Sequence, residues 1–506
     1  MATLTNLNPS VKEIPALVDR LRQNFFDHPT RDIASLKQQL KSLKKALEKH
    51  RESLAASLFQ DFHRSVAETL IMEFGCVCDE INYLVNHLST LLQNDTPDEV
   101  SAAFATLNIT VEKIPLGTVL IIVPFNYPLL LSLSPLIGAI AAGNNVVLKL
   151  PYDKCPEFCL ELTRTLLEGL DSKRIAVVNG GIPESDALLN EKFDKIMFTG
   201  SGRVGQIVME KAAKHLTPMI LELGGKSPTF LTSKCGNLKK AIRRIVWGKF
   251  INAGQTCVAP DYLLLEDKIY DESIKLIIET TKELFPKIGP DAIFTHLVDE
   301  RSFNRMSGYL DKTEGKIVLG GSKDRASLFL EPTVVSDIQF SDVLMKEELF
   351  GPILPIIRYS DLKKTVDTVK TQVDTPLAVY IFSDSKEEQQ VIKTIRSGGL
   401  CINDTLMHAG CHSVPFGGIG ASGFGNYHGR YSIRAFTHER AILKQPYWAD
   451  GLIAVRYPPF TNENMRKFLF LGKFPAIPSV NWMEIVKLIV LLGVGIGIGI
   501  GIGVSI

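Results

Sequence analysis

Short apolar runs alternate with helix-length stretches along most of this chain, and this alternation constrains the fold more than any other feature. The first set, after residue 111, reads GTVLIIVPFNYP, NNVVLKLP, RIAVVNGG and KIMFTGS. A second set, from residue 219, reads MILELGG, YLLLED, KIVLGG, LAVYIFS and GLCINDT. Runs rich in β-branched residues and separated by helices are typical of parallel strands buried on both faces. We therefore predict two α/β lobes with sites at the carboxyl ends of their strands, preceded by a helical segment over residues 12–100.

The length and charge of the chain bound the class of protein. At 506 residues it is too long for one ordinary core, so we expect two or three domains. The net charge of +1 gives no electrostatic reason for a nucleic-acid partner. The first residues hold no apolar core of signal-peptide type, so we do not expect secretion, and the eight cysteines are better explained as reduced thiols. The pairs Cys76/Cys78 and Cys155/Cys159 lack further ligands, and we predict no metal site.

The last 19 residues, LIVLLGVGIGIGIGIGVSI over 488–506, carry no charge. As a helix they would extend about 28 Å, close to the thickness of the hydrocarbon core of a bilayer. The alternating glycines also suit a strand, a flexible tail or a hairpin, but a helix satisfies its own amides in lipid. Because Arg466, Lys467, Lys473 and Lys487 precede the span and nothing charged follows it, we predict a membrane anchor with the bulk of the protein in the cytosol.

One cysteine, Cys257, stands in a stretch of small and polar residues, FINAGQTCVAP. Such a stretch predicts a loop, which exposes a sulfur that a core would hide, and Gly254 allows backbone amides to approach. The alternative is an inert buried thiol, the commoner fate of a free cysteine. A nucleophilic role for Cys257 therefore requires a base and a charge stabiliser elsewhere.

The stretch MFTGSGRVG follows a predicted strand and leads into a helix. Gly200, Gly202 and Gly205 have the spacing G-x-G-x-x-G, and a helix start offers free N–H groups to a pyrophosphate. Glycines also end strands for steric reasons alone, so the spacing leaves both interpretations open.

Two further polar residues follow apolar runs. Glu222 ends the run MILE, where partial loss of water raises the pKa of a carboxyl and suits a base. Asn126 lies between two prolines in VPFNYP, where a rigid amide is able to donate to an oxyanion. A surface glutamate at a turn and a structural asparagine are the alternatives.

Taken in order, Asn126, Lys149, the glycine turn, Glu222, Cys257 and the stretch EELFGP make the chain resemble the aldehyde dehydrogenase superfamily. The similarity is strongest to its class 3, fatty-aldehyde branch, in the fungal form with a C-terminal membrane anchor, and spans about residues 10–460. The stretches GQTCVAPDY, INDTLMH and VPFGGIGASGFGNYHGRYSIRAFTH are the specific ones.

The resemblance implies a catalytic role for three residues. Cys257 is the nucleophile that attacks the aldehyde, and its own N–H and the Asn126 amide stabilise the oxyanion. Hydride then leaves for the nicotinamide, and Glu222 activates the water that hydrolyses the thioester. Covalent capture in this way divides one oxidation into two steps.

The resemblance also implies a cofactor site for NAD, with NADP as an alternative. Lys149 and Glu348 hold ribose hydroxyls, and Phe350 packs near the nicotinamide. The turn at the pyrophosphate comprises Gly200, Ser201, Gly202, Arg203, Val204 and Gly205.

One departure from the family pattern affects this cofactor site. The family usually follows the lysine with Pro-Ser-Glu, whose glutamate contacts the adenosine ribose. Here Leu150, Pro151 and Tyr152 follow Lys149. The usual carboxylate is missing from its position unless Asp153 replaces it, so the preference between NAD and NADP stays open.

The substrate side rests on the same resemblance. Tyr427 and His428 are expected at the entrance of a hydrophobic aldehyde site, and the substrates expected are medium- or long-chain fatty aldehydes. Other hydrophobic aldehydes, aromatic or apocarotenoid, are the alternative within the family. An inactive membrane scaffold or a thiol hydrolase is the alternative of another class. A cysteine–histidine dyad that uses His408, His412 or His428 is disfavoured, because Glu222 already supplies a base.

The expected organisation is an α/β chain with a Rossmann-like cofactor domain, an α/β catalytic domain, a small β oligomerisation extension and a C-terminal transmembrane helix. A homodimer is expected through strands near 102–116 and 438–456, at the endoplasmic reticulum, mitochondrial outer membrane or peroxisome. The expected boundaries are 1–106 for the helical part of the cofactor domain, 107–221 for the Rossmann-like domain, 222–425 for the catalytic domain, 426–483 for the oligomerisation and C-terminal region, and 484–506 for the anchor.

Overall fold

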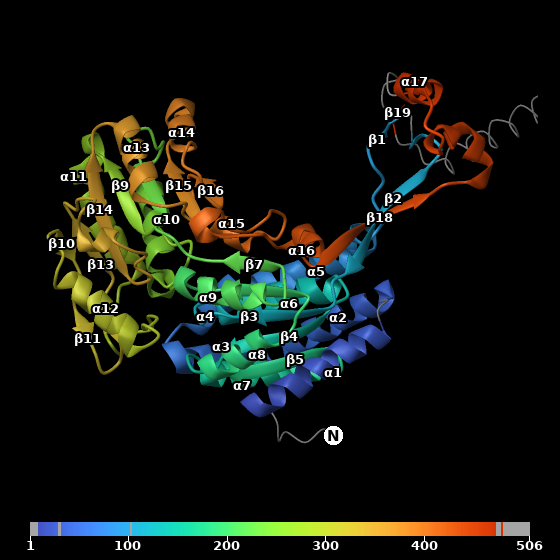
Figure 1. Ribbon diagram of the computed structural model, residues 1–506. Coiled ribbons are helices and arrows are strands. Elements are labelled where there is room, and N and C mark those ends of the chain that lie inside the picture. Colours follow the sequence, from blue (N-terminus) through green and yellow to red (C-terminus); the bar gives the residue numbers. More distant parts are fainter. Residues whose placement is uncertain (1–8, 29–31, 102–103, 472–476, 479–506) are drawn as a thin grey trace, which may run out of the picture. The chain divides into compact units, whose positions relative to one another are not determined.

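The computed structural model describes residues 9–28, 32–101, 104–471 and 477–478. The chain divides into two compact units. The first comprises Met1–Leu91 and Pro115–Phe436, and the second comprises Leu92–Ile114 and Thr437–Ile506. The first unit holds both predicted α/β lobes (Figure 1).

The lobe that is expected to bind the cofactor, called the cofactor lobe below, is built on a six-stranded sheet in the order β17-β7-β6-β3-β4-β5. Its strands are β3 (Thr118–Ile122), β4 (Asn145–Pro151), β5 (Ile175–Gly180), β6 (Lys195–Thr199), β7 (Met219–Glu222) and β17 (Gly423–Phe424). The first five are parallel, as predicted, because a helix returns the chain between each pair. β17 is antiparallel to β7 and comes from about 200 residues later in the chain. A two-residue strand carries no apolar run, so the sequence did not predict it.

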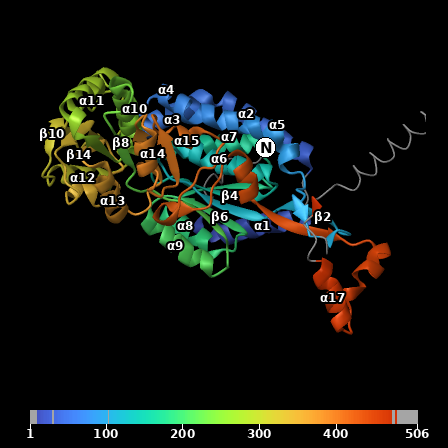
Figure 2. The same ribbon diagram turned by 90° about the horizontal axis from the view of Figure 1, so that it is seen from above.

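Helices cover both faces of this sheet (Figure 2). On one face lie α1 (Ile14–Asp27), α8 (Ile182–Asn190) and α9 (Gly202–Ala213). On the other face lie α6 (Pro128–Ala141) and α7 (Pro156–Gly169). Outside α6 and α7 lie α2 (Ile33–Lys49), α3 (Arg51–Phe62) and α5 (Gly75–Leu91). The short α4 (Val66–Thr69) and the π-helical turn η3 (Leu70–Phe74) link α3 to α5. The helical prediction for 12–100 is confirmed as far as Leu91; β1 (Glu99–Val100) follows.

The lobe that is expected to carry the nucleophile, called the catalytic lobe below, contains a seven-stranded sheet in the order β10-β13-β14-β9-β8-β15-β16. Its strands are β8 (Pro228–Leu231), β9 (Tyr262–Glu266), β10 (Lys316–Leu319), β13 (Thr333–Ser336), β14 (Ile353–Tyr359), β15 (Ala378–Phe382) and β16 (Gly399–Ile402). All neighbours are parallel except β10, which follows β9 by a long connection and pairs antiparallel with β13. The wholly parallel prediction is therefore wrong at this edge.

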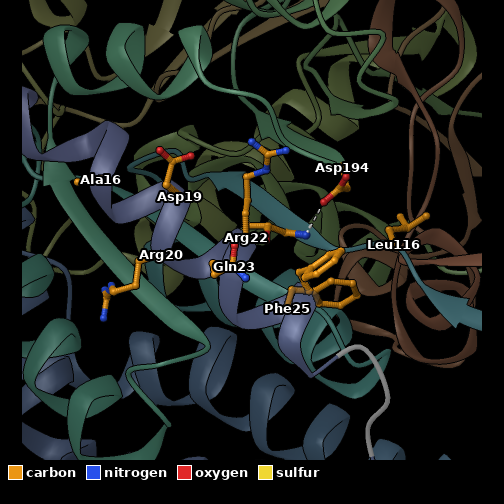
Figure 3. A pocket seen from close by; sticks show the side chains of 10 residues that line it. Ala16, Asp19, Arg20, Arg22, Gln23, Phe25, Leu116 and Asp194 are labelled. Carbon is orange, nitrogen blue, oxygen red and sulfur yellow. Dashed lines mark hydrogen bonds between the residues drawn. The ribbon is translucent and has the colours of Figure 1, made fainter.

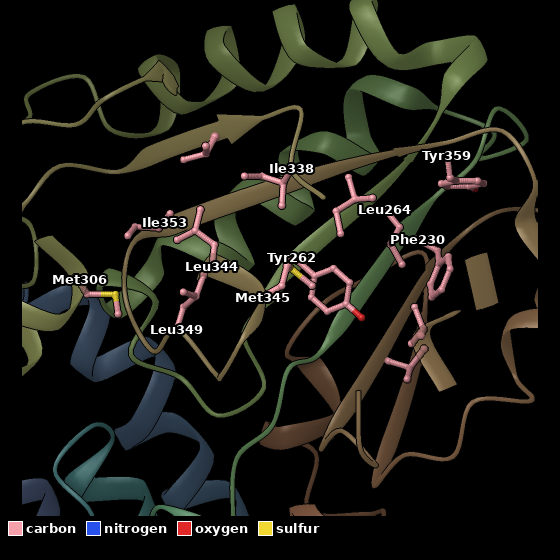
Figure 4. Close-up of a cluster of buried hydrophobic side chains, with 14 of the residues drawn as sticks. Phe230, Tyr262, Leu264, Met306, Ile338, Leu344, Met345, Leu349, Ile353 and Tyr359 are labelled. Carbon is pink, nitrogen blue, oxygen red and sulfur yellow. The ribbon is translucent and has the colours of Figure 1, made fainter. Parts of the chain in front are cut away.

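The core of the catalytic lobe lies between this sheet and its helices (Figure 4). Phe230, Tyr262 and Leu264 from β8 and β9 meet Met306 of α12 (Glu300–Leu310) and Ile353 of β14. The remaining helices are α10 (Leu238–Phe250), α11 (Tyr270–Leu284), α13 (Leu362–Gln372) and α14 (Lys386–Ile392). Burial of these aromatic and aliphatic side chains fixes the strands that carry the site.

The second unit pairs β2 (Asn108–Pro115) with β18 (Thr437–Lys444), and Arg440 forms an ion pair with Glu112. The strand predicted for 438–456 ends at Lys444 and is followed by a 3₁₀ helix, Tyr447–Arg456, and by α17 (Asn462–Leu471). The predicted span 484–506 lies outside the described residues. Within the ranges that are described, no helix is long and apolar enough to cross a bilayer.

Candidate active site

The carboxyl edge of the cofactor-lobe sheet brings four predicted site elements together. Asn126 follows β3, Lys149 lies near the end of β4, the glycine turn follows β6 and Glu222 ends β7. β3 and β6 are neighbours, and the chain leaves β3 toward β4 and β5 and later returns on the other side of β3 as β6. Such a reversal of strand order opens a crevice at the carboxyl ends of an α/β sheet. The predicted residues of this lobe therefore lie at the predicted edge of its sheet.

The catalytic lobe contributes from the opposite ends of its strands. Cys257 lies in the loop before β9, and Glu348 and Phe350 lie in the segment before β14. The prediction that both lobes use carboxyl strand ends is therefore wrong for the catalytic lobe. In the catalytic lobe, the segments before the strands are the ones that contact the cofactor lobe. The rings of Phe350 and Phe125 lie 5.9 Å apart, and a Cβ on Gly224, which follows β7, would lie 2.1 Å from Glu348 Oε2.

The loop that carries Cys257 has an unusual backbone. Asn252, Ala253 and Gly254 have φ of 51°, 52° and 69°, and a Cβ on Gly254 would lie 2.3 Å from the carbonyl oxygen of Gly351. A left-handed backbone costs Gly254 nothing, but it is costly at Asn252 and Ala253 and persists there only where neighbouring structure holds it. The thiol itself is half-buried, unlike those of the fully buried Cys155 and Cys159.

Opposing effects act on the pKa of the Cys257 thiol. Burial raises the pKa of the Cys257 thiol, and the negative charges of Glu348 and Glu222 raise it further. The N–H groups of Cys257 and Val258 point at the sulfur and lower this pKa. A binding site that adds positive charge would favour the thiolate, which is the reactive form.

Glu222 is buried beside this thiol. Neither of its carboxylate oxygens has a hydrogen-bond partner within the described part of the chain. Burial raises the pKa of Glu222 well above its ordinary value of 4.5. A buried carboxyl without partners, close to a thiol, is typical of a base and is costly for stability alone.

A buried arginine joins the two halves of the site. The Arg64 guanidinium forms an ion pair with Glu73 and donates to the backbone oxygen of Asn126 (2.8 Å) and to Asn252 Oδ1 (3.3 Å). Asn252 Nδ2 donates to the same Asn126 oxygen at 2.9 Å. Next to Asn126 and Cys257 in the two loops, the Tyr127 hydroxyl lies 3.0 Å from Thr256 Oγ1. These bonds fix the loop of Asn126 against the loop of Cys257.

Other buried charges hold the segment that carries Glu348. Lys226 pairs with Asp261 and donates to the backbone oxygens of Leu344 (2.9 Å) and Glu347 (3.0 Å), and the N–H of Leu349 donates to Asp261 Oδ1 at 3.0 Å. Burial is the main cause that lowers the pKa of nearby Lys249 to about 8.

Sequence reasoning missed Arg64, Lys226, Lys249 and Asp261. The signal for two of them was present, since Lys249 and Asp261 interrupt apolar stretches eight residues before and four after Cys257.

The residues at the crevice fit a dinucleotide. Ser201 caps α9 without a side-chain hydrogen bond, and no atom lies within 4 Å of a Cβ placed on Gly202, so the first N–H groups of α9 are open to a pyrophosphate. Burial lowers the pKa of Lys149, and Glu348 Oε1 has no partner among the described residues. Arg203 is exposed, whereas Val204 packs into the hydrophobic core of the lobe.

Tyr427 and His428 lie between β17 and the helix α16 (Gly429–Ala435), and their expected place at the substrate entrance stays a prediction. Both side chains are buried, and the pKa of Tyr427 is raised by burial and by the charges of Glu222, Glu80 and Cys257. His428 stacks on Phe416 with centroids 5.5 Å apart. His408 Nδ1 lies 3.1 Å from Cys401 Sγ, so this histidine contacts a cysteine other than Cys257.

A wide surface hollow of about 1050 Å³ lies elsewhere (Figure 3). Arg20 and Phe25 of α1, Leu116 and Asp194 help to line it, and Asp194 accepts the N–H of Thr118 at 2.7 Å. Because Thr118 begins β3 and Asp194 precedes β6, this hollow is at the amino edge of the sheet. It is therefore separate from the crevice with Asn126 and Glu222.

We expect Arg64→Met to lower the free energy of unfolding by about 3–5 kcal/mol, because it leaves the Glu73 carboxylate buried without its cation. The matched control is Arg440→Met, which breaks the partly exposed pair with Glu112 and should cost less than about 1 kcal/mol. Urea unfolding of both variants measures the difference. Equal losses of unfolding free energy in the two variants would show that the buried pair of Arg64 and Glu73 contributes no more than a surface ion pair.

We expect Glu222→Gln to stabilise the protein at pH 8. The raised pKa of Glu222 means that the folded state holds its proton more tightly than the unfolded state, so stability falls as pH rises above about 4.5. Glutamine carries no charge, so its advantage should grow between pH 5 and pH 8 in thermal melts. Glu168→Gln should act oppositely, since hydrogen bonds from Lys49 and His50 lower the pKa of Glu168. If the difference in melting temperature between Glu222→Gln and the natural protein did not change with pH, the raised pKa assigned to Glu222 would be contradicted.

Comparison with known proteins places this chain in a family. A sequence profile described as "Aldehyde dehydrogenase family" matches residues 9–442. The "Fatty aldehyde dehydrogenase HFD1" of Saccharomyces cerevisiae is 42% identical over 476 residues, which cover 90% of this chain and 89% of the relative. The "Beta-apo-4'-carotenal oxygenase" of Neurospora crassa is 40% identical over 456 residues, 90% of this chain and 85% of the relative.

A solved structure agrees with these relatives. "Substrate bound state of Staphylococcus Aureus AldH" superposes with a TM-score of 0.85 at 36% identity, and the match covers 90% of this chain and 99% of that one. The chain therefore belongs to the aldehyde dehydrogenase family, and it is an oxidoreductase that oxidises aldehydes with NAD or NADP.

Proposed function

We propose that this protein oxidises medium- and long-chain fatty aldehydes to fatty acids, with Cys257 as the nucleophile and Glu222 as the base. The observation that carries the proposal is the half-buried Cys257 thiol beside the buried, unpartnered carboxyl of Glu222. The similarity to a fungal fatty aldehyde dehydrogenase supports the choice of substrate.

In the first step, the Cys257 thiolate attacks the aldehyde carbonyl and forms a thiohemiacetal. The N–H of Cys257 and the Asn126 amide donate to the oxyanion that develops on the former carbonyl oxygen. Bound NAD(P)+ supplies the chemistry that accepts a hydride from this carbon. Cys257 is then left as a thioester.

In the second step, Glu222 accepts a proton from a water molecule, whose oxygen attacks the thioester carbonyl. The carbon–sulfur bond breaks, the carboxylic acid leaves and Cys257 returns as a thiolate. The raised pKa of Glu222 suits this role, because a base works best when its pKa lies near the working pH.

The similarity to the Neurospora protein supports a second candidate, the oxidation of apocarotenoid or other hydrophobic aldehydes. The two candidates share one mechanism and differ in substrate. The scaffold alternative is disfavoured, because Cys257, Glu222 and Asn126 are all present in the crevice. A hydrolase without a redox step is disfavoured by the open helix start after β6.

The test is turnover of hexadecanal with NAD(P)+. Cys257→Ser should abolish NAD(P)H formation, whereas Glu222→Gln should form one equivalent and hold the acyl group on Cys257, visible by mass spectrometry of the intact protein. Cys235→Ser, which changes a thiol in the catalytic lobe outside the proposed site, is the control. Full activity of Cys257→Ser would sink the proposal, and faster turnover of an apocarotenal would favour the second candidate.

We further propose that residues 484–506 anchor the protein in a membrane with its catalytic unit in the cytosol, where a lipid-like aldehyde concentrates. In cells, the full chain should resist extraction from membranes at alkaline pH, and a chain that ends at Asn481 should be soluble. Release of the full chain by alkali would refute the anchor. The predicted homodimer and the domain boundaries stay predictions, and sedimentation of the detergent-solubilised chain tests the dimer.

A further inference from the structure

Cys257 lies in a tight turn of the backbone. The N–H of Ala259 donates to the backbone oxygen of Thr256 at 2.9 Å, so Cys257 and Val258 are the two central residues of a β-turn. The N–H groups of both central residues point at the Cys257 sulfur. Because each peptide unit is planar, the direction of these two donors depends on how the turn is held by its surroundings.

The hydroxyl of Tyr380 holds the Val258 end of this turn. Tyr380 lies in the middle of β15, which is buried along its whole length, and its own side chain is fully buried. The hydroxyl donates to the backbone oxygen of Val258 at 2.5 Å and accepts the N–H of Leu406 at 3.3 Å. One oxygen atom thus joins the turn of Cys257 to the loop that follows β16.

Burial alone does not explain a hydroxyl at this position. The other residues of β15, in the run AVYIF, are apolar, and a phenylalanine would fill the same space. Both hydrogen bonds of the Tyr380 hydroxyl go to loops rather than to strands. Tyr262 of β9, in the same sheet, is equally buried, but its hydroxyl has no partner among the described residues (Figure 4). The two tyrosines therefore differ in what their hydroxyls hold.

The surroundings of Tyr380 make this contact a fixed one. Leu406 has a left-handed backbone with φ of 60°, and the hydroxyl of the preceding Thr405 donates to the backbone oxygen of Arg244 at 3.0 Å. Burial raises the pKa of Tyr380 well above its ordinary value of 10, so the hydroxyl keeps its proton and acts as a donor. The Val258 carbonyl is therefore tied to a constrained part of the core.

We propose that Tyr380 is a positioning residue for the nucleophile: its hydroxyl fixes the Val258 carbonyl and thereby aims the N–H groups of the turn at the Cys257 sulfur. The N–H of Cys257 is also the proposed donor to the oxyanion, so a displaced turn affects both the thiolate and the first step of the reaction. Tyr380 acts through Val258 and is not itself a catalytic residue. The inference rests on the proposed role of Cys257 as the nucleophile.

The test compares Tyr380→Phe with Tyr262→Phe in the full chain. Each variant removes one buried hydroxyl from the same sheet and keeps the ring, but only the first removes a bond to the turn. Alkylation of Cys257 by iodoacetamide without cofactor is followed by mass spectrometry of the peptides over a range of pH. The alkylation of Cys235, which lies outside the proposed site, is the internal reference, and thermal melts confirm that both variants fold.

Tyr380→Phe should slow the alkylation of Cys257 at neutral pH by about five-fold, since the net contribution of one hydrogen bond corresponds to about this factor. The pH at which Cys257 becomes reactive should rise by about 0.7 unit, the equivalent of that factor, while Cys235 is unaffected. The kcat for hexadecanal should fall by a similar factor at an unchanged KM for NAD+. Tyr262→Phe should alter none of these quantities.

Alkylation of Cys257 at the natural rate and pH in Tyr380→Phe would overturn the inference. Equal slowing in Tyr262→Phe, or slowing of Cys235 together with Cys257, would also overturn it, because a general loosening of the core would then be the cause. These outcomes leave the proposed function standing, since it is tested separately by the loss of NAD(P)H formation in Cys257→Ser.

Discussion

The site depends on one buried guanidinium. Arg64 is fully buried, and its contacts join α3's C-terminal turn to the loop after β3 and to the loop before β9. A charge so deep is stable only where carboxylates and carbonyl oxygens surround it, and Glu73 supplies the balancing charge. The geometry between Asn126 and Cys257 therefore depends on helices that contribute nothing to the chemistry.

Buried ion pairs also help to offset the cost of keeping Glu222 and Cys257 away from water. Burial raises the pKa of Glu222 and that of the Cys257 thiol, and the negative charges of Glu348 and Glu222 raise the pKa of the thiol further. A protein selected for stability alone would pair or remove these groups. The network around Arg64 and the pair of Lys226 with Asp261 offset part of that cost by fixing the loops on both sides.

Much of the fold was predictable because it rests on local patterns. Apolar runs such as those of β3 and β4 form strands wherever helices cover both faces of the sheet. The leucines of α2 recur at helical spacing and lie on its buried face. The errors occurred where long-range pairing decides. β17 has two residues and no pattern, and β10 is antiparallel to β13 because residues 320–332, which connect the two strands, contain no helix that would return the chain in the same direction. Likewise, Cys257 and Glu222 stand in recognisable stretches, whereas Arg64 meets Asn252 across 188 positions of sequence.

The pairing of β17 with β7 has a consequence for synthesis. Gly423 lies opposite Glu222, so the strand that carries the proposed base keeps an unpaired edge until the ribosome has made about 200 further residues. An open strand edge attracts other strands. The nascent chain must therefore carry this edge while the strands of the catalytic lobe between β7 and β17 are made, and the cofactor lobe is completed only after them.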